Sequence, residues 1–233
     1  MMYNNCMSDM FEKLVFANEK EKKDFNTYLP QRGVYLFKQV YDILLEGQDA
    51  VSYFELSSTI RYDKALRYKL YEYLALLEEN LRNQLLHAYD VASAIGGLYK
   101  QHTKDLDSDL IEKHDLASSK LYYRLEIDFS KLMEICDGKG LVSISKCDRQ
   151  RLKDLRNATM HHSLLLFGHS HNVADVMEHI KQLERQLKTL YAHLPETYRR
   201  GFITAMNDLN GKEEHYLDRF YLEGTKDGIC VKI

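Results

Sequence analysis

Arg156 and His161 are the two side chains of this sequence best suited by type and spacing to chemistry. Four residues separate them, in a segment whose apolar spacing predicts a helix. An arginine guanidinium stays charged and can grip phosphate oxygens in a fork, and an imidazole can take or give a proton at cellular pH. Together they could cut a phosphodiester that has a neighbouring hydroxyl group, a reaction that in principle needs no metal.

Position on the helix separates this pair from chance matches of the same spacing. A helix advances about 100° per residue, which places Asn157 between Arg156 and His161 on the open side of the wheel. His162 falls at the margin of the apolar side. That side carries Leu152, Leu155, Ala158, Leu165 and Leu166.

A cationic stripe leads along the same helix towards Arg156. Lys146, Arg149 and Lys153 lie in line with Arg156 on the wheel, although the whole chain carries a net charge of −3. We interpret the stripe as a substrate-binding surface for phosphates. The alternative is that it is only the solvated face of an amphipathic helix.

The same spacing occurs once more, at Arg82 and His87. Glu78 lies four residues before Arg82, so an ion pair along one helix face is the simplest role for that arginine. Catalysis at Arg82 and His87 is the less favoured interpretation. We expect Glu78 to pack near the helix that carries Arg156 and to orient its guanidinium.

The segment Leu155–Phe167, LRNATMHHSLLLF, resembles the signature of the Abi-like branch of the HEPN superfamily. That signature is Leu-Arg-Asn, three residues and then His-His-Ser, and residues 155–157 and 161–163 match it in order. Residues 53–57 are similar to the aromatic-rich upstream segment of the family. Residues 77–82 are similar to its acidic helix with an arginine.

The resemblance covers residues 30 to 200, and Thr159-Met160 stand where the family often has Cys-Ala. It implies an all-α, HEPN-like helical bundle that cleaves or binds RNA. It also implies a homodimer in which the motifs of two protomers face one cleft, and a role in phage defence or in a toxin system. An antitoxin or other regulatory protein would then be a partner.

The motif and the resemblance together predict metal-independent cleavage of single-stranded RNA without a cofactor. His161 acts as general base or acid on the ribose 2′-hydroxyl or the leaving 5′-oxygen, and Arg156 neutralises charge on the phosphoryl oxygens. Asn157 holds phosphate or orients His161. The alternative function is a non-catalytic HEPN-like regulatory module that docks RNA or a partner protein without cutting it.

Tyrosine is abundant, with seventeen residues and no tryptophan in the chain. Unpaired bases stack well on aromatic rings, so a tyrosine cluster raises the prospect of RNA binding. Tyrosine also serves as a large residue at the boundary of a core, with its hydroxyl in water. Packing is the favoured interpretation of the cluster Tyr53, Tyr62, Tyr68, Tyr71 and Tyr73.

Composition is typical of a helical globular protein of the cytoplasm. Two prolines and eleven glycines stand against 45% apolar and 29% charged residues. The sequence shows neither a basic, apolar leader nor a long apolar run, which predicts no secretion and no membrane contact. The net negative charge disfavours coating of duplex nucleic acid by charge alone, so recognition of RNA would be local.

The sequence favours no metal site. The cysteines have no close pair and are interpreted as reduced thiols at Cys6, Cys136, Cys147 and Cys230. The clustered histidines fit the ligand spacing of zinc poorly, and they are His161, His162, His169 and His171.

Apolar spacing and chain-breaking residues predict the helices that must position the motif. The motif helix is expected to follow Ser145, which caps it together with Asp148. The other predicted helices span 8–28, before Pro30, and then 33–46, 63–95, 108–136, 173–193 and 196–209. We expect three parts: an N-terminal helical extension (1–32), a HEPN-like bundle (33–210) and a C-terminal tail or short hairpin (211–233).

Overall fold

The computed structural model of the protein describes residues 10–88, 128–161 and 163–210, and within these ranges the fold is all-α, as predicted. Its helices are α2 (Glu19–Arg32), α3 (Val34–Leu45), α4 (Tyr53–Ala88), α7 (Phe129–Gly138), α8 (Lys146–Met160), α9 (Val173–His193) and α10 (Glu196–Asn210). Two short strands, β1 (Leu14–Val15) and β2 (Val51–Ser52), pair in parallel.

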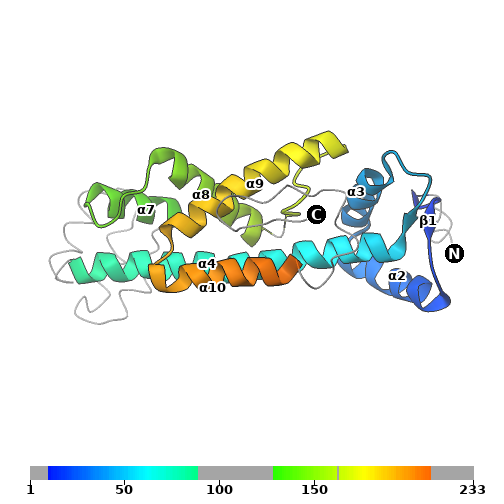
Figure 1. Ribbon diagram of the computed structural model, residues 1–233, viewed down its shortest axis with the longest axis horizontal. Helices are drawn as coiled ribbons and strands as arrows, with labels where there is room; N and C mark the ends of the chain where they lie inside the picture. The colour runs from blue at the N-terminus through cyan, green and yellow to red at the C-terminus, as the bar shows by residue number, and fades with distance from the viewer. Residues whose placement is uncertain (1–9, 89–127, 162, 211–233) are drawn as a thin grey trace, which may run out of the picture.

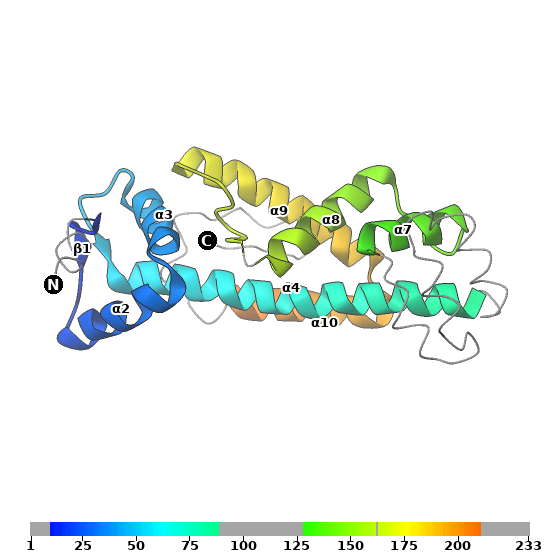
Figure 2. The same ribbon diagram turned by 180° about the vertical axis from the view of Figure 1, so that it is seen from behind.

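Helix α4 is the axis of the arrangement. Figures 1 and 2 show it running along most of the described length, with α10 beside it and with α7, α8 and α9 together on one side. The two strands, α2 and α3 cover the N-terminal end of α4 (Figure 1). Edge-on ring contact between Tyr73 of α4 and Phe202 of α10, with centroids 5.0 Å apart, ties these two helices together.

The N-terminal segment differs from the prediction of a helix over 8–28. Residues 14 and 15 form β1, and α2 begins only at Glu19. Asn18 sets this start, because its side chain accepts the N–H of Glu21 at 3.0 Å while Glu21 accepts the N–H of Ala17 at 2.8 Å. Pro30 lies inside α2 instead of after it.

Two further helix boundaries were predicted wrongly. Helix α4 starts ten residues earlier than position 63, after Ser52, whose hydroxyl accepts the N–H of Glu55 at 3.1 Å. Helix α7 starts at Phe129 because Asp128 leaves the helical conformation and accepts the N–H of Lys131 at 2.9 Å. The predicted ends at 95 and 108 lie outside the described residues, as do the tail from 211 and His87's side chain.

The remaining helices follow the prediction closely. The helix predicted over 33–46 is α3, and Gly47 after it takes the positive φ of 73° that glycine tolerates. The helix predicted over 173–193 is confirmed with the same bounds, and that over 196–209 differs by one residue. Among the described helices, none is long and apolar enough to span a membrane.

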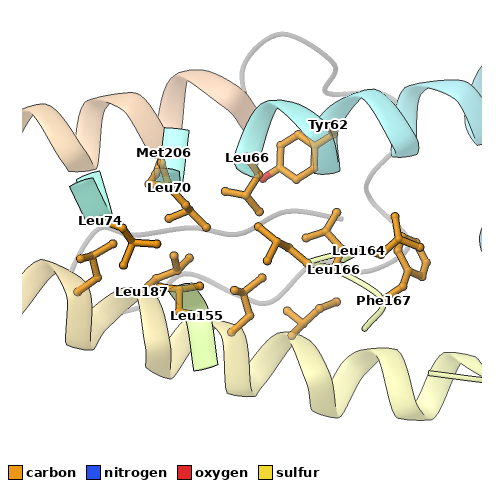
Figure 3. Close-up of a cluster of buried hydrophobic side chains, with 14 of the residues drawn as sticks. Tyr62, Leu66, Leu70, Leu74, Leu155, Leu164, Leu166, Phe167, Leu187 and Met206 are labelled. Atoms are coloured by element: carbon orange, nitrogen blue, oxygen red, sulfur yellow. The ribbon is translucent and has the colours of Figure 1, made fainter. Parts of the chain in front are cut away.

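The core that holds α8 in place is made by apolar side chains from four helices and from the segment that follows α8 (Figure 3). Full burial of one such side chain stabilises a fold by roughly 1.5–3 kcal/mol. The labelled members are Tyr62, Leu66, Leu70 and Leu74 of α4, Leu155 of α8, Leu187 of α9, Met206 of α10, and Leu164, Leu166 and Phe167. The motif helix is therefore fixed against α4 and α9.

Candidate functional site

The start of α8 is set as the sequence predicted. The Ser145 hydroxyl accepts the N–H of Asp148 at 3.1 Å and donates to its carboxylate at 2.8 Å. Leu152, Leu155 and Thr159 form the buried face of the helix. The register of α8, and with it the direction of Arg156, follows from this cap and this face.

His161 is exposed at the end of α8. The helix ends at Met160, and the backbone N–H of His161 donates to the carbonyl of Asn157 at 2.9 Å. The helical wheel therefore does not apply to Leu165 and Leu166, which it placed on the apolar face of the same helix. The side chain of His162 lies outside the described residues.

Arg156 is half-buried, and its Nε atom is buried without a hydrogen-bond partner among the described residues. The expected support from Glu78 stays a prediction, since no contact between Glu78 and Arg156 is seen among the described residues. Glu78 accepts a hydrogen bond at 2.7 Å from Arg82, four residues along the same helix. The predicted Glu78–Arg82 ion pair is thus confirmed, and Arg156 has no carboxylate partner in the described parts of the chain.

Two of the three cations in the predicted stripe on α8 are exposed, and the third is paired with a carboxylate. Lys146 and Lys153 are exposed. Arg149 instead donates to the Asp137 carboxylate at 2.7 Å, and the same carboxylate accepts the N–H of Ile144 at 3.0 Å. Arg149 therefore secures the turn between α7 and α8, and its assignment to substrate binding stays a prediction.

The four residues after Ser163 are all buried, which explains why the helix stops. Leu164, Leu165, Leu166 and Phe167 are each at most 6% exposed. Successive residues of a helix point about 100° apart, so a helix cannot direct four consecutive side chains into one core. An irregular buried segment has to satisfy its backbone groups in other ways.

Asp63 of α4 provides one of those partners, and sequence reasoning missed it. Its carboxylate, wholly inaccessible to solvent, accepts the N–H of Leu166 at 3.0 Å and lies 3.0 Å from Nε of Arg67. Burial raises the pKa of Asp63, while the backbone hydrogen bonds and Arg67 act in the opposite direction. A signal was present: Asp63 falls on the apolar face of α4, with an arginine four residues on.

Two further side chains satisfy this segment from other helices. His179 of α9 contacts the carbonyl of Leu165 at 2.8 Å, which requires its Nε2 to carry the proton. Gln39 of α3 donates to the carbonyls of Gly168 and Ser170 at 3.0 and 3.3 Å. Helices α3, α4 and α9 thus converge on the segment that leaves His161.

His179 makes the stability of this segment sensitive to pH. Burial lowers its pKa below the ordinary 6.5, and nearby His169 acts in the same direction against the Leu165 carbonyl. The unfolded chain therefore binds the proton more readily than the folded protein. The stability that neutral His179 contributes is present above pH 6.5 and is lost as the pH falls through the folded-state pKa.

We therefore expect the free energy of unfolding in urea to decrease between pH 7 and pH 5, and to do so less steeply in His179→Gln. His171→Gln is the control, because His171 is exposed near the same segment. Equal slopes in wild type and His179→Gln would contradict the assignment.

The other candidate metal ligands do not assemble within the described ranges, where no three His, Cys, Asp or Glu side chains are placed to hold an ion. His169 and His171 are exposed. Cys136 is buried, which raises the pKa of its thiol to about 11 against the effect of Arg82, and Cys147 is exposed. Both thiols are free; Cys6 and Cys230 lie outside the described residues.

The last turns of α8 thus bring together one exposed imidazole, one half-buried guanidinium and the amide of Asn157. Arg156 and His161 are separated by about 7.5 Å along the helix axis and by about 140° around it. No protein-family model, no curated protein and no solved structure matches this chain.

Proposed function

We propose that this protein is a metal-independent endoribonuclease that cleaves single-stranded RNA. The observation that supports the proposal most directly is the state of Arg156. Its Nε has no hydrogen-bond partner in the described part of the chain, in the same helix end that presents His161 to solvent. Nε itself is inaccessible to solvent, so a phosphate would pair with the half-buried guanidinium as a whole, which has no carboxylate partner in the described part of the chain.

The reaction requires one nucleophile, one leaving group and two proton transfers. A base removes the proton of the ribose 2′-hydroxyl, the 2′-oxygen attacks phosphorus, and the bond from phosphorus to the 5′-oxygen breaks. An acid returns a proton to that 5′-oxygen, so the products are a 2′,3′-cyclic phosphate and a 5′-hydroxyl. His161 serves one of these transfers, and Arg156 neutralises the developing charge on the phosphoryl oxygens.

The remaining transfer falls to a second imidazole. The resemblance to the Abi-like branch of the HEPN superfamily supports a homodimer, in which His161 of a second protomer would face the same phosphate. Exposure of His161 at the helix end leaves it accessible to such a partner. The same resemblance supports a role in phage defence or in a toxin system restrained by an antitoxin.

The test is cleavage of an RNA oligonucleotide with a single 2′-deoxy nucleotide at the mapped cut site. We expect cleavage there to stop, with other sites unaffected, and EDTA to have little effect. New ends should be a 2′,3′-cyclic phosphate and a 5′-hydroxyl. Activity that EDTA abolishes and manganese restores would replace the proposal with a metal mechanism. Tight binding of RNA that stays intact would favour the regulatory module.

A further inference from the structure

Helix α4 carries an exposed stripe on the face that points away from the bundle. We define the α4 outer stripe as Arg61, Lys64, Tyr68 and Tyr71, all of them exposed. Tyr68 and Tyr71 are 65% and 52% exposed, in contrast to Tyr53, Tyr62 and Tyr73, which are buried. Packing, the favoured interpretation of the tyrosine cluster, thus holds for three of its members and fails for these two.

The stripe is regular because its members recur every three or four residues. At about 100° and 1.5 Å per residue they fall within roughly 80° of one another and extend about 15 Å along α4. Lys64 and Tyr68 are in direct contact, with Nζ 5.5 Å from the centre of the ring. Along α4 the stripe therefore presents two cations, Arg61 and Lys64, followed by two aromatic rings, Tyr68 and Tyr71.

The charge of this face is positive. Between Phe54 and Tyr71 the only acidic residues are Glu55 and Asp63, and Asp63 is buried against Arg67. The next acidic residue, Glu72, lies 3.2 Å from the ammonium group of Lys69. An exposed surface with two cations and two aromatic rings complements a polyanion that has flat, unpaired bases.

We propose that the α4 outer stripe binds single-stranded RNA, with bases stacked on Tyr68 and Tyr71 and with phosphates near Arg61 and Lys64. The inference rests on the proposed function for the choice of RNA as ligand. It adds a second contact with the substrate, because α8 packs against the opposite face of α4, where Leu66 and Leu70 lie (Figure 3). A strand held there would be gripped at a distance from the scissile phosphate.

The test measures the dissociation constant of a fluorescein-labelled 2′-O-methyl oligouridine, which has bases and phosphates but cannot be cleaved by 2′-hydroxyl attack. The double variant Tyr68→Ala/Tyr71→Ala should bind it about 10- to 100-fold more weakly than wild type, as expected for lost base stacking. Tyr35→Ala is the matched control, because Tyr35 on α3 is 86% exposed and outside the stripe. Its affinity should equal that of wild type.

Two further measurements show whether the stripe contacts the bases or the phosphates of the oligonucleotide. An abasic oligonucleotide of the same length should bind wild type and double variant equally, because it offers phosphates without bases. Lys64→Gln should make binding less dependent on salt: the slope of the logarithm of the binding constant against the logarithm of the salt concentration should decrease in magnitude by about 0.7. Circular dichroism should show the same helix content in all variants, since each substitution is on the surface.

The inference is overturned if the double variant binds the oligouridine as tightly as wild type. It is also overturned if wild type does not bind, or if sedimentation shows that the double variant has lost a dimer and the stripe is a contact between copies. The cleavage assay tests the proposed nuclease function independently of RNA binding by the stripe. If binding depends on the stripe but the protein never cuts RNA, the proposed binding surface is supported and the proposed nuclease activity is contradicted.

Discussion

His161→Ala is expected to cleave single-stranded RNA about 10²- to 10⁴-fold more slowly than wild type, which is the usual contribution of a positioned proton-transfer group. His161 is exposed beyond the last turn of α8, so truncation of its side chain leaves the core intact. The loss should therefore appear in the rate of bond cleavage and not in the fraction of folded protein. Single-turnover cleavage of a labelled oligonucleotide measures it, with thermal unfolding recorded on the same samples.

The matched control for that experiment is His171→Ala, which removes another exposed histidine near the same segment. It should cleave at the wild-type rate. Arg156→Lys provides a second comparison, because lysine keeps the charge but cannot form the bidentate fork of a guanidinium. A rate for His161→Ala equal to that of wild type would exclude His161 from the reaction, and equal losses in both histidine variants would indicate a general effect of charge.

Helices with sustained apolar spacing were predictable from the sequence, and their ends were predictable where a capping residue stands out. Helix α9 has the predicted bounds, and Ser145 caps α8 as expected. Helix α2 begins later than apolar spacing alone indicates. Apolar residues near position 11 fit helical spacing, but Asn18 and Glu21 cap a helix that starts after them, and residues 14 and 15 pair with β2 instead.

The residue types of the candidate site were predictable from the sequence, but the contacts between helices that hold these residues in place were not. Spacing along one helix is local information, so the exposure of His161 follows from the wheel. Contacts between helices are not local. The Glu78–Arg82 and Asp63–Arg67 pairs are four residues apart within α4 and can be read from spacing, whereas Asp137 of α7 reaches Arg149 of α8 through packing that neither segment encodes alone.

Asp63→Ala is expected to lower the free energy of unfolding by about 3–5 kcal/mol, the usual cost of removing one partner of a buried ion pair. The variant leaves the Arg67 guanidinium, whose side chain is 14% exposed, without its carboxylate. It also removes the acceptor of the Leu166 N–H within a buried segment that has no access to water for compensation. Urea unfolding at pH 7 measures the change.

Asp63→Asn distinguishes the two losses, because asparagine keeps a carbonyl oxygen for Leu166 but carries no charge for Arg67. It should be less destabilised than Asp63→Ala, since burial already disfavours the charged form of Asp63 and raises its pKa. Adding Arg67→Met to Asp63→Ala should recover part of the stability, because the solitary cation is then gone. If the free energy of unfolding of Asp63→Ala differs from that of wild type by less than about 0.5 kcal/mol, the usual scatter of surface substitutions, the segment after His161 is held by the apolar core alone.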